Sequence, residues 1–193
     1  MIATARKHAA FLIPRIQEVS PQHAAILPSE MLAFCAMCLE QGVIRVVESG
    51  RRYGYSTDVL SRMPWETVSI ENSPEAEYDS RLDNVTLLKG NGEQMVPLLV
   101  GAGTAVLLDG PKGLKAWALF QQIRNKIVLC GIHDVYRGTQ IRDMAAGAFF
   151  TDQQEFVDEF GWLDAEMFKM RGFTSHSELF SGGNVLAILA GGH

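Results

Sequence analysis

The chain has 193 residues, of which 47% are apolar and 20% are charged. This composition is typical of a globular protein and excludes collagen-like, disulfide-scaffold and mainly disordered chains. Its 17 Lys and Arg residues against 22 Asp and Glu residues give a formal charge of −5, whereas a protein that mainly binds nucleic acid or anionic membranes would be basic. The length predicts one domain over residues 1–193, with an N-terminal helical segment at 1–41 and an α/β core at 42–193.

The N-terminal region predicts two helices and no membrane span. A looser helix is expected before Pro14, which interrupts the apolar residues Phe11, Leu12 and Ile13. No apolar run approaches the roughly 20 residues that a spanning helix needs, and no signal-peptide pattern precedes Pro14. We therefore expect a cytoplasmic protein that does not associate with membranes. A second, apolar helix is expected at residues 30–41.

This second helix contains a Cys-x-x-Cys sequence at Cys35 and Cys38. The surrounding residues are apolar, and no second Cys or His pair lies near enough in the sequence to complete a zinc site. Cysteine behaves as a small apolar residue in protein cores. We therefore interpret both residues as buried thiols, with a redox or metal-binding role as the alternative.

Short apolar runs alternate with helix-period segments through the middle of the chain. Five buried strands are predicted at residues 43–47, 67–70, 85–88, 104–108 and 127–130. Helices are predicted between them at residues 56–63, 74–82, 94–100 and 114–124. Continuous apolar strands that alternate with helices indicate a parallel sheet with helices on both faces.

The C-terminal part has a different pattern. Helices are expected at residues 138–148 and 152–159, followed by two strands at 173–180 and 185–189. The residues between those strands, Ser181-Gly182-Gly183-Asn184, have turn chemistry and predict an antiparallel hairpin. The predicted fold is therefore an α/β, Rossmann-like, mostly parallel seven-stranded sheet with a C-terminal antiparallel hairpin.

Polar residues follow the ends of the predicted parallel strands. They are Glu48, Glu71, Asn91, Asp109, His133 and Asp134. Ligands of open parallel sheets bind at the carboxyl ends of the strands, near the point where the strand order reverses. We therefore expect these side chains to converge on one crevice, although each acid alone is also compatible with a helix cap or a solvated loop.

The first of these strand ends opens into a glycine-containing loop. Gly50 and Gly54 permit a tight turn and bring a ligand close to the backbone. Ser56 is expected to cap the following helix, whose N-terminus can bind an anion. At the next two strand ends, Glu71 can accept hydrogen bonds from a ribose diol, and Asn91 can pair with an adenine. The alternatives are a helix cap at Glu71 and a turn residue at Asn91.

With these residues, the chain resembles the class I S-adenosylmethionine (SAM)-dependent methyltransferases from about residue 29 to residue 189. The resemblance is carried by Glu48-x-Gly50-x-x-x-Gly54-x-Ser56-Thr57, by the acid at Glu71, and by Leu108-Asp109-Gly110-Pro111-Lys112-Gly113. The chain is most similar to small O-methyltransferases of the catechol and caffeoyl-CoA type. In these proteins an Asp-x-x-Lys follows the fourth strand and a polar pair follows the fifth.

The resemblance implies a SAM site in which the glycine loop and Ser56 hold the methionine end, Glu71 holds the ribose and Asn91 lies against the adenine. The candidate cofactor-binding residues are Glu48, Gly50, Gly54, Ser56, Glu71, Asn91 and Asp109. One position departs from the commonest family loop, which has a glycine where this chain has Arg52. A bulky residue there changes how closely the backbone can meet the ligand.

The candidate catalytic residues are Asp109, Lys112 and His133. Methyl transfer from a sulfonium is an in-line displacement, and the protein must align the acceptor and help it lose a proton. Lys112, with a pKa lowered by burial, is one candidate base, and His133, oriented by Asp134, is the other. The resemblance also implies a divalent metal at Asp109, His133 and Asp134. An imidazole in that set suits Mn, Fe, Co or Zn better than Mg.

The predicted function is therefore SAM-dependent methyl transfer to a small-molecule acceptor, through an oxygen nucleophile. The resemblance to small enzymes of this type also implies a homodimer. Two alternatives remain. The first is a degenerate protein that binds SAM or a nucleotide without transferring methyl, for which Arg52 is the main support. The second is a nicotinamide-dependent oxidoreductase, against which the missing Gly-x-Gly-x-x-Gly counts.

Overall fold

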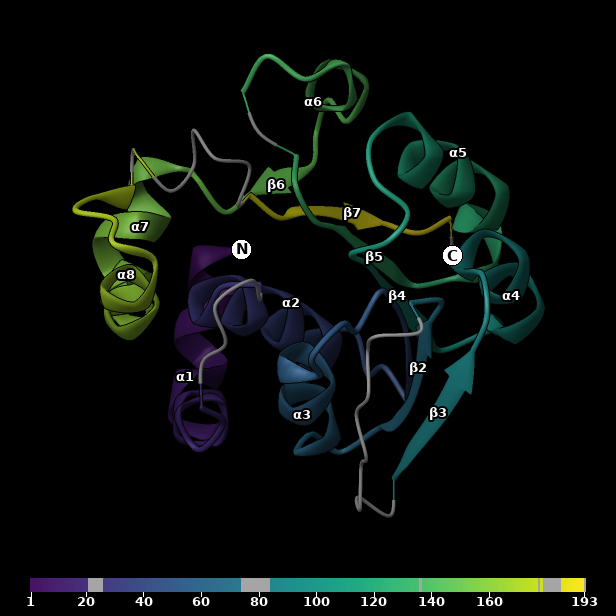
Figure 1. Cartoon of the computed structure of the whole chain (residues 1–193), viewed down its shortest axis with the longest axis horizontal. Coiled ribbons are helices and arrows are strands. Elements are labelled where there is room, and N and C mark those ends of the chain that lie inside the picture. Colours follow the sequence, from purple (N-terminus) through teal and green to yellow (C-terminus); the bar gives the residue numbers. More distant parts are fainter. Residues whose placement is uncertain (21–25, 74–83, 136, 177, 179–184, 193) are drawn as a thin grey trace.

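A mixed β-sheet crosses the middle of the molecule and has helices on both faces (Figure 1). The computed structural model describes residues 1–20, 26–73, 84–135, 137–176, 178 and 185–192. Within these residues the sheet has seven strands in the order β3-β2-β1-β4-β5-β7-β6. The strands are β1 (Arg45–Ser49), β2 (Glu66–Glu71), β3 (Val85–Lys89), β4 (Thr104–Leu108), β5 (Leu129–Ile132), β6 (Phe149–Phe150) and β7 (Ala187–Ala190). Strands β1 to β5 are parallel, and β7 runs antiparallel to β5 and β6.

Helices cover the two faces of the sheet as separate groups (Figure 1). One face packs against α1 (Ile2–Gln17), α2 (Pro28–Glu40), α3 (Tyr55–Ser61) and α7 (Gln154–Phe160). The other packs against α4 (Gly92–Leu99), α5 (Leu114–Ile123) and α6 (Gln140–Met144). Further helical segments are η1 (Arg124–Lys126), η2 (Gly161–Asp164) and α8 (Ala165–Arg171). None of the described helices combines the length and apolar character that a membrane crossing requires.

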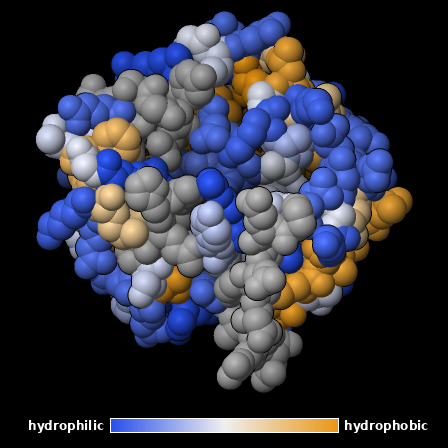
Figure 2. All heavy atoms as spheres, viewed as in Figure 1, coloured by the Kyte–Doolittle hydropathy of each residue, from blue (hydrophilic) through white to orange (hydrophobic). Residues whose placement is uncertain are grey.

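The strand residues show why the central strands are continuously apolar. On β4, Ala105 and Leu107 belong to the core against α1, α2 and α3, whereas Val106 and Leu108 belong to the core against α4 and α5. Successive side chains of a strand point to opposite faces, so a strand covered on both sides must be apolar at every position. Burial of each Val or Leu side chain of this strand contributes about 1.5–3 kcal/mol. The outer surface is different, because hydrophilic residues predominate on the face shown in Figure 2.

The five predicted parallel strands and the fold class are confirmed, and the predicted C-terminal hairpin needs a correction. On the side of β7 away from β5, the antiparallel partner is β6, and the described residues of the predicted strand at 173–180 take no part in the sheet. Residues 173–176 form no strand. Phe173 packs against Met167 of α8, and Thr174 donates hydrogen bonds to the nearby Glu178. The predicted turn at 181–184 and the predicted helix at 74–82 lie outside the described residues.

The first helix also differs from the prediction, because α1 continues through Pro14 to Gln17. Proline inside a helix costs about 3 kcal/mol, since it removes one hydrogen bond and crowds the preceding turn. Leu12 and Ile16, on either side of Pro14, are both fully buried in the core shared with α2. Packing on both sides of the proline therefore holds the last turn of α1 in place.

Candidate active site

The site lies where the strand order reverses, between β1 and β4. Asp109 and Gly110, after β4, both donate their backbone N–H to the carbonyl oxygen of Ser49, at 2.9 and 2.8 Å. Gly50, after β1, donates to the carbonyl oxygen of Ile70 on β2 at 2.9 Å. The loops that follow these strands are thereby fixed against each other at the carboxyl edge of the sheet, the usual ligand position of an open parallel sheet.

A cavity of about 210 Å³ opens at this edge. It is lined by the loops after β1, β2, β3 and β4, including the predicted cofactor residues Gly50, Glu71 and Asn91. Gly110 and Pro111 form the side that belongs to β4. The structure thus brings Gly50, Glu71 and Asn91 from separate strand ends to one cavity. The other residues expected at the same crevice do not line this cavity: Glu48, Asp109, His133 and Asp134.

Glu71, at the end of β2, ties this cavity to the glycine loop. Its Oε2 accepts the backbone N–H of Arg52 at 2.7 Å, and its Oε1 accepts those of Asn72 and Ser73 at 2.8 and 2.7 Å. Arg52 has a φ of +46°, a left-handed conformation that suits glycine far better than other residues. The backbone at this position is therefore one that glycine adopts without strain. Arg52 keeps the loop conformation and adds an exposed side chain.

Asn91, after β3, is the N-cap of α4. Its Oδ1 accepts the backbone N–H of Glu93 at 2.8 Å, which satisfies one of the free N–H groups of the first helical turn. The amide oxygen is therefore engaged in the helix cap, and the amide nitrogen remains as the group to meet an adenine. Glu93 also lines the cavity, and no sequence pattern singles it out.

Glu48 and Ser56 lie behind the glycine loop and do not line the described cavity. Glu48 is fully buried and accepts hydrogen bonds from the hydroxyls of Ser56, Thr57 and Ser69. Burial raises the pKa of Glu48 despite these three donors. The prediction that Ser56 caps α3 is wrong, because its hydroxyl donates to Glu48 and the N-cap is Gly54, with a φ of +88°. The predicted contacts of Glu48, Gly54 and Ser56 with a cofactor stay predictions.

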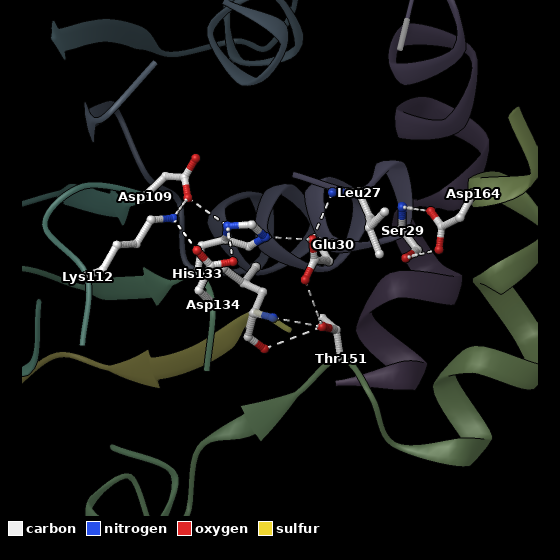
Figure 3. A network of polar contacts seen from close by, with 10 residues as sticks. Leu27, Ser29, Glu30, Asp109, Lys112, His133, Asp134, Thr151 and Asp164 are labelled. Atoms are coloured by element: carbon white, nitrogen blue, oxygen red, sulfur yellow. Dashed lines mark hydrogen bonds and ion pairs between the residues drawn. The ribbon is translucent and has the colours of Figure 1, made fainter. Parts of the chain in front are cut away.

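Asp109, Lys112, His133 and Asp134 form one polar cluster beside the loop after β4 (Figure 3). His133 Nδ1 lies 2.6 Å from Asp109 Oδ1 and 3.2 Å from Asp134 Oδ1. Lys112 Nζ contacts Asp109 and lies 2.6 Å from Asp134 Oδ2. Asp134 has a φ of +62°, a strained conformation of the kind that persists at functional sites.

The charges of this cluster hold Lys112 protonated. Burial opposes the lysine charge, but the carboxylates of Asp109 and Asp134 outweigh it and raise the pKa of Lys112 above its ordinary value. Burial likewise opposes the Asp109 charge, and His133 and Lys112 outweigh it and lower the pKa of Asp109. The predicted lowering of the Lys112 pKa is therefore wrong, because two carboxylates face the ammonium group instead of other cations.

His133 is buried between carboxylates on both sides of its ring. Its Nε2 lies 3.2 Å from Oε2 of Glu30, an ion-pair distance without the alignment of a hydrogen bond. Burial disfavours the imidazolium, but Asp109 and Glu30 outweigh this effect and raise the pKa of His133 to about 10. In this arrangement His133 is a hydrogen-bond donor at neutral pH, and it can serve as a base or metal ligand only after it loses a proton.

Glu30 is the site residue that the sequence did not reveal. It lies in the first turn of α2 and is fully buried. Its Oε2 accepts the backbone N–H of Leu27 at 2.8 Å, and its Oε1 accepts the hydroxyl of Thr151 at 3.3 Å. An acid in the first turn of a helix is expected for capping reasons alone. Nothing in the local pattern indicates the histidine that it meets.

The same helix end is anchored by a second buried carboxylate. Asp164 accepts the backbone N–H and the hydroxyl of Ser29 at 2.9 and 2.7 Å (Figure 3). Through this contact and the Thr151–Glu30 contact, the segments after β6 are fixed to the N-terminal end of α2. The carboxylates of Glu30 and Asp164 therefore share one helix end, and the one that lies at ion-pair distance from His133 is that of Glu30.

The cysteines play no part in this cluster. Cys35, Cys38 and Cys130 are buried free thiols, and burial raises the pKa of each. The buried-thiol interpretation of the Cys-x-x-Cys sequence is confirmed. Among the described residues, the group of ligand types close enough to hold a metal is Asp109, His133 and Asp134, whose ligand atoms lie within 4.8 Å of one another.

Comparison with known proteins adds to this geometry. Neither a scan against models of protein families nor a search of curated proteins finds a match. Solved structures do match. An O-methyltransferase from Bacillus cereus in complex with S-adenosylhomocysteine (SAH) is 17% identical, with a TM-score of 0.54, over 98% of this chain and all of that chain.

Two further structures cover 98% of this chain and 88% of their own. The SAH-bound methyltransferase PaMTH1 from Podospora anserina is 14% identical, with a TM-score of 0.52. The O-methyltransferase TomG from Streptomyces achromogenes, in complex with SAM, is 17% identical, with a TM-score of 0.50. At such low identities these likenesses concern the fold. The chain thus has the fold of the SAM-dependent methyltransferases.

Proposed function

We propose that the chain is a SAM-dependent methyltransferase that acts on an oxygen atom of a small-molecule acceptor. The fold supports the proposal, and one observation carries it. The cavity lined by Gly50, Glu71 and Asn91 and the polar cluster around Asp109 share the loop after β4, since Gly110 lines the cavity and follows Asp109 directly. A donor site and a reaction site are thereby adjacent. A small acceptor is proposed because the sheet and its covering helices take up most of the chain.

The cavity residues supply the groups that a bound nucleoside needs. Glu71 can accept hydrogen bonds from a ribose diol while it holds the loop, because each carboxylate oxygen accepts more than one. The amide nitrogen of Asn91 can donate to an adenine ring nitrogen. The close contact of the loops after β1 and β4 lets the ligand approach backbone atoms at Gly50.

The reaction itself is an in-line displacement. The acceptor oxygen attacks the methyl carbon of the sulfonium, the new C–O bond forms as the C–S bond breaks, and the sulfur leaves as a neutral thioether. The acceptor hydroxyl must also lose its proton. Lys112 is the better placed base, because 47% of its side chain is exposed against 5% for His133. It must first release the proton that Asp109 and Asp134 hold on it, so transfer is expected to accelerate in alkaline solution.

The polar cluster also fits a divalent cation. Asp109, His133 and Asp134 offer one nitrogen and two carboxylate groups to a common point, a donor set suited to Mn, Fe, Co or Zn. When bound, such an ion would lower the pKa of the acceptor hydroxyl and orient it. The protein's own part is to keep the three ligands together, which the contacts of His133 with both carboxylates achieve.

Calorimetry with SAM, SAH and NAD tests the proposal, followed by transfer of a labelled methyl group from SAM to a panel of small hydroxyl compounds. We expect micromolar-range binding of SAM and SAH and label in at least one acceptor. Binding of SAM without transfer to any acceptor would instead favour a degenerate ligand-binding protein. Binding of NAD alone would favour an oxidoreductase.

A further inference from the structure

We propose that Glu30 is a positioning residue that orients His133 as a metal ligand. This inference rests on the proposed function, because it concerns the polar cluster of the same site. Glu30 lies far from His133 in the sequence. In this proposal both residues, His133 as the ligand and Glu30 as its support, determine which metal the cluster binds.

The geometry of the His133 ring carries the proposal (Figure 3). Nδ1 faces the two carboxylates of the candidate ligand set, 2.6 Å from Asp109 and 3.2 Å from Asp134. Nε2, on the far side of the ring, faces Glu30 at 3.2 Å. Both His133 and Glu30 are buried, at 5% and 0% exposure. The ring therefore has one nitrogen toward the ligand oxygens and the other toward a carboxylate that water does not reach.

Glu30 is itself held rigidly enough to orient a neighbour. The backbone N–H of Leu27 and the hydroxyl of Thr151 each donate to it, from the start of α2 and from the segment after β6. The N-terminal end of a helix also stabilises a negative charge. A buried carboxylate needs such partners, because an unpaired charge in the interior is costly. Its position is thus fixed by contacts with two segments, independently of His133.

Histidines that bind metals characteristically donate their second ring N–H to a carboxylate or carbonyl. The partner fixes the ring orientation and the tautomer, and its loss typically lowers metal affinity about 10–100-fold. With a proton on Nε2 directed at Glu30, the Nδ1 lone pair points at the space shared with Asp109 and Asp134. An imidazole held in this way favours Mn²⁺, Co²⁺ or Zn²⁺ over Mg²⁺, which prefers oxygen ligands and water.

Binding of Mn²⁺, followed by the electron paramagnetic resonance signal of the free ion, tests this role without measuring activity. We expect wild-type chain to bind Mn²⁺ more tightly than Mg²⁺, the latter measured by competition. Glu30→Ala should lower Mn²⁺ affinity about 10–100-fold. Glu30→Gln should lose less, because an amide oxygen at the same position can accept from Nε2 although the charge is gone.

Asp164→Asn is the matched control. It alters a buried carboxylate at the same end of α2, so it perturbs the helix through Ser29 and not through His133. Circular dichroism and thermal midpoints are measured for every variant. We expect Asp164→Asn to lose stability with Mn²⁺ affinity unchanged, and Glu30→Gln provides a folded variant if Glu30→Ala does not fold.

Three results would overturn the proposal: wild-type chain that binds no Mn²⁺, unchanged Mn²⁺ affinity in folded Glu30 variants, or an equal loss in Asp164→Asn. SAH binding is measured on the same samples and separates this inference from the proposed function. If SAH binds and the Glu30 variants bind Mn²⁺ as tightly as the wild type, the proposed role of Glu30 is wrong and the proposed function is not affected. If Mn²⁺ affinity depends on Glu30 but SAH does not bind, the proposed function fails instead.

Discussion

Gly50 and Gly110 meet at the point where the strand order reverses, and their contact leaves no room for a side chain. A Cβ added to Gly50 would lie 2.6 Å from the backbone nitrogen of Gly110. Gly50 also has a φ of +91°, which L side chains rarely adopt. Both glycines line the cavity, so this wall of the proposed cofactor site consists of backbone from two strands that are neighbours in the sheet.

Gly50→Ala should therefore damage both stability and ligand binding. The backbone strain alone costs about 1–3 kcal/mol, and the clash with Gly110 must displace the loop after β4. Urea unfolding and SAH calorimetry measure the two effects. Gly42→Ala is the control, because Gly42 has a φ of +64° and nothing within 4 Å of an added Cβ. Equal losses in both variants would show that strain, and not the contact between the loops, sets the cost at Gly50.

The parallel core could be predicted from the sequence because its signals are local. A run such as residues 104–108 is buried at every position of β4, and only a strand covered on both faces has this pattern. The strand ends then place Glu71 and Asn91 at one cavity. The C-terminal pairing was missed because β6 has two residues, Phe149 and Phe150, too few for any periodicity to appear.

The candidate site was predictable only in part, because some of its contacts depend on tertiary packing that leaves no local pattern in the sequence. Asp109 and His133 follow neighbouring parallel strands, so their contact at 2.6 Å could be expected from topology. Glu30 reaches His133 from a helix that packs on the sheet, and the packing of a helix is set by tertiary contacts. The direction of the Lys112 pKa was missed because it depends on two carboxylates, those of Asp109 and Asp134, that both face the ammonium group. The left-handed backbone that places Asp134 there is not visible in sequence.

Replacing Glu71 by Gln should weaken SAH binding by about 1.5–3 kcal/mol, the contribution of hydrogen bonds to a charged group. Because Glu71 also accepts the backbone N–H of Arg52, part of the loss could come from the loop. An SAH analogue without the ribose 2′- and 3′-hydroxyls separates the two effects. It should bind wild type and variant with nearly equal affinity. Glu66→Gln, at the exposed start of the same strand, should leave SAH affinity unchanged.

Lys112→Met should slow methyl transfer about 10²–10⁴-fold, the usual contribution of a general base, with little change in SAM affinity. Single-turnover rates and SAM calorimetry check the two parts. Lys115→Met is the control, since Lys115 is 73% exposed and pairs with Glu93 at 3.6 Å. The wild-type rate should also rise with pH toward the raised pKa of Lys112. Turnover of Lys112→Met at the wild-type rate at every pH would exclude Lys112 as the base.

The contribution of His133 to the stability of the metal-free chain should decrease as the solution becomes alkaline. The pKa of His133 is about 10 in the folded chain, above the value of about 6.5 expected when unfolded. Its stabilising contribution is therefore fully present below about pH 6.5 and is lost as the pH rises through about 10. Urea unfolding in EDTA compares wild type with His133→Asn, and the stability gap between them should shrink steadily from pH 6.5 to pH 10. A gap that stays constant over this range would show that Asp109 and Glu30 do not hold a proton on the ring.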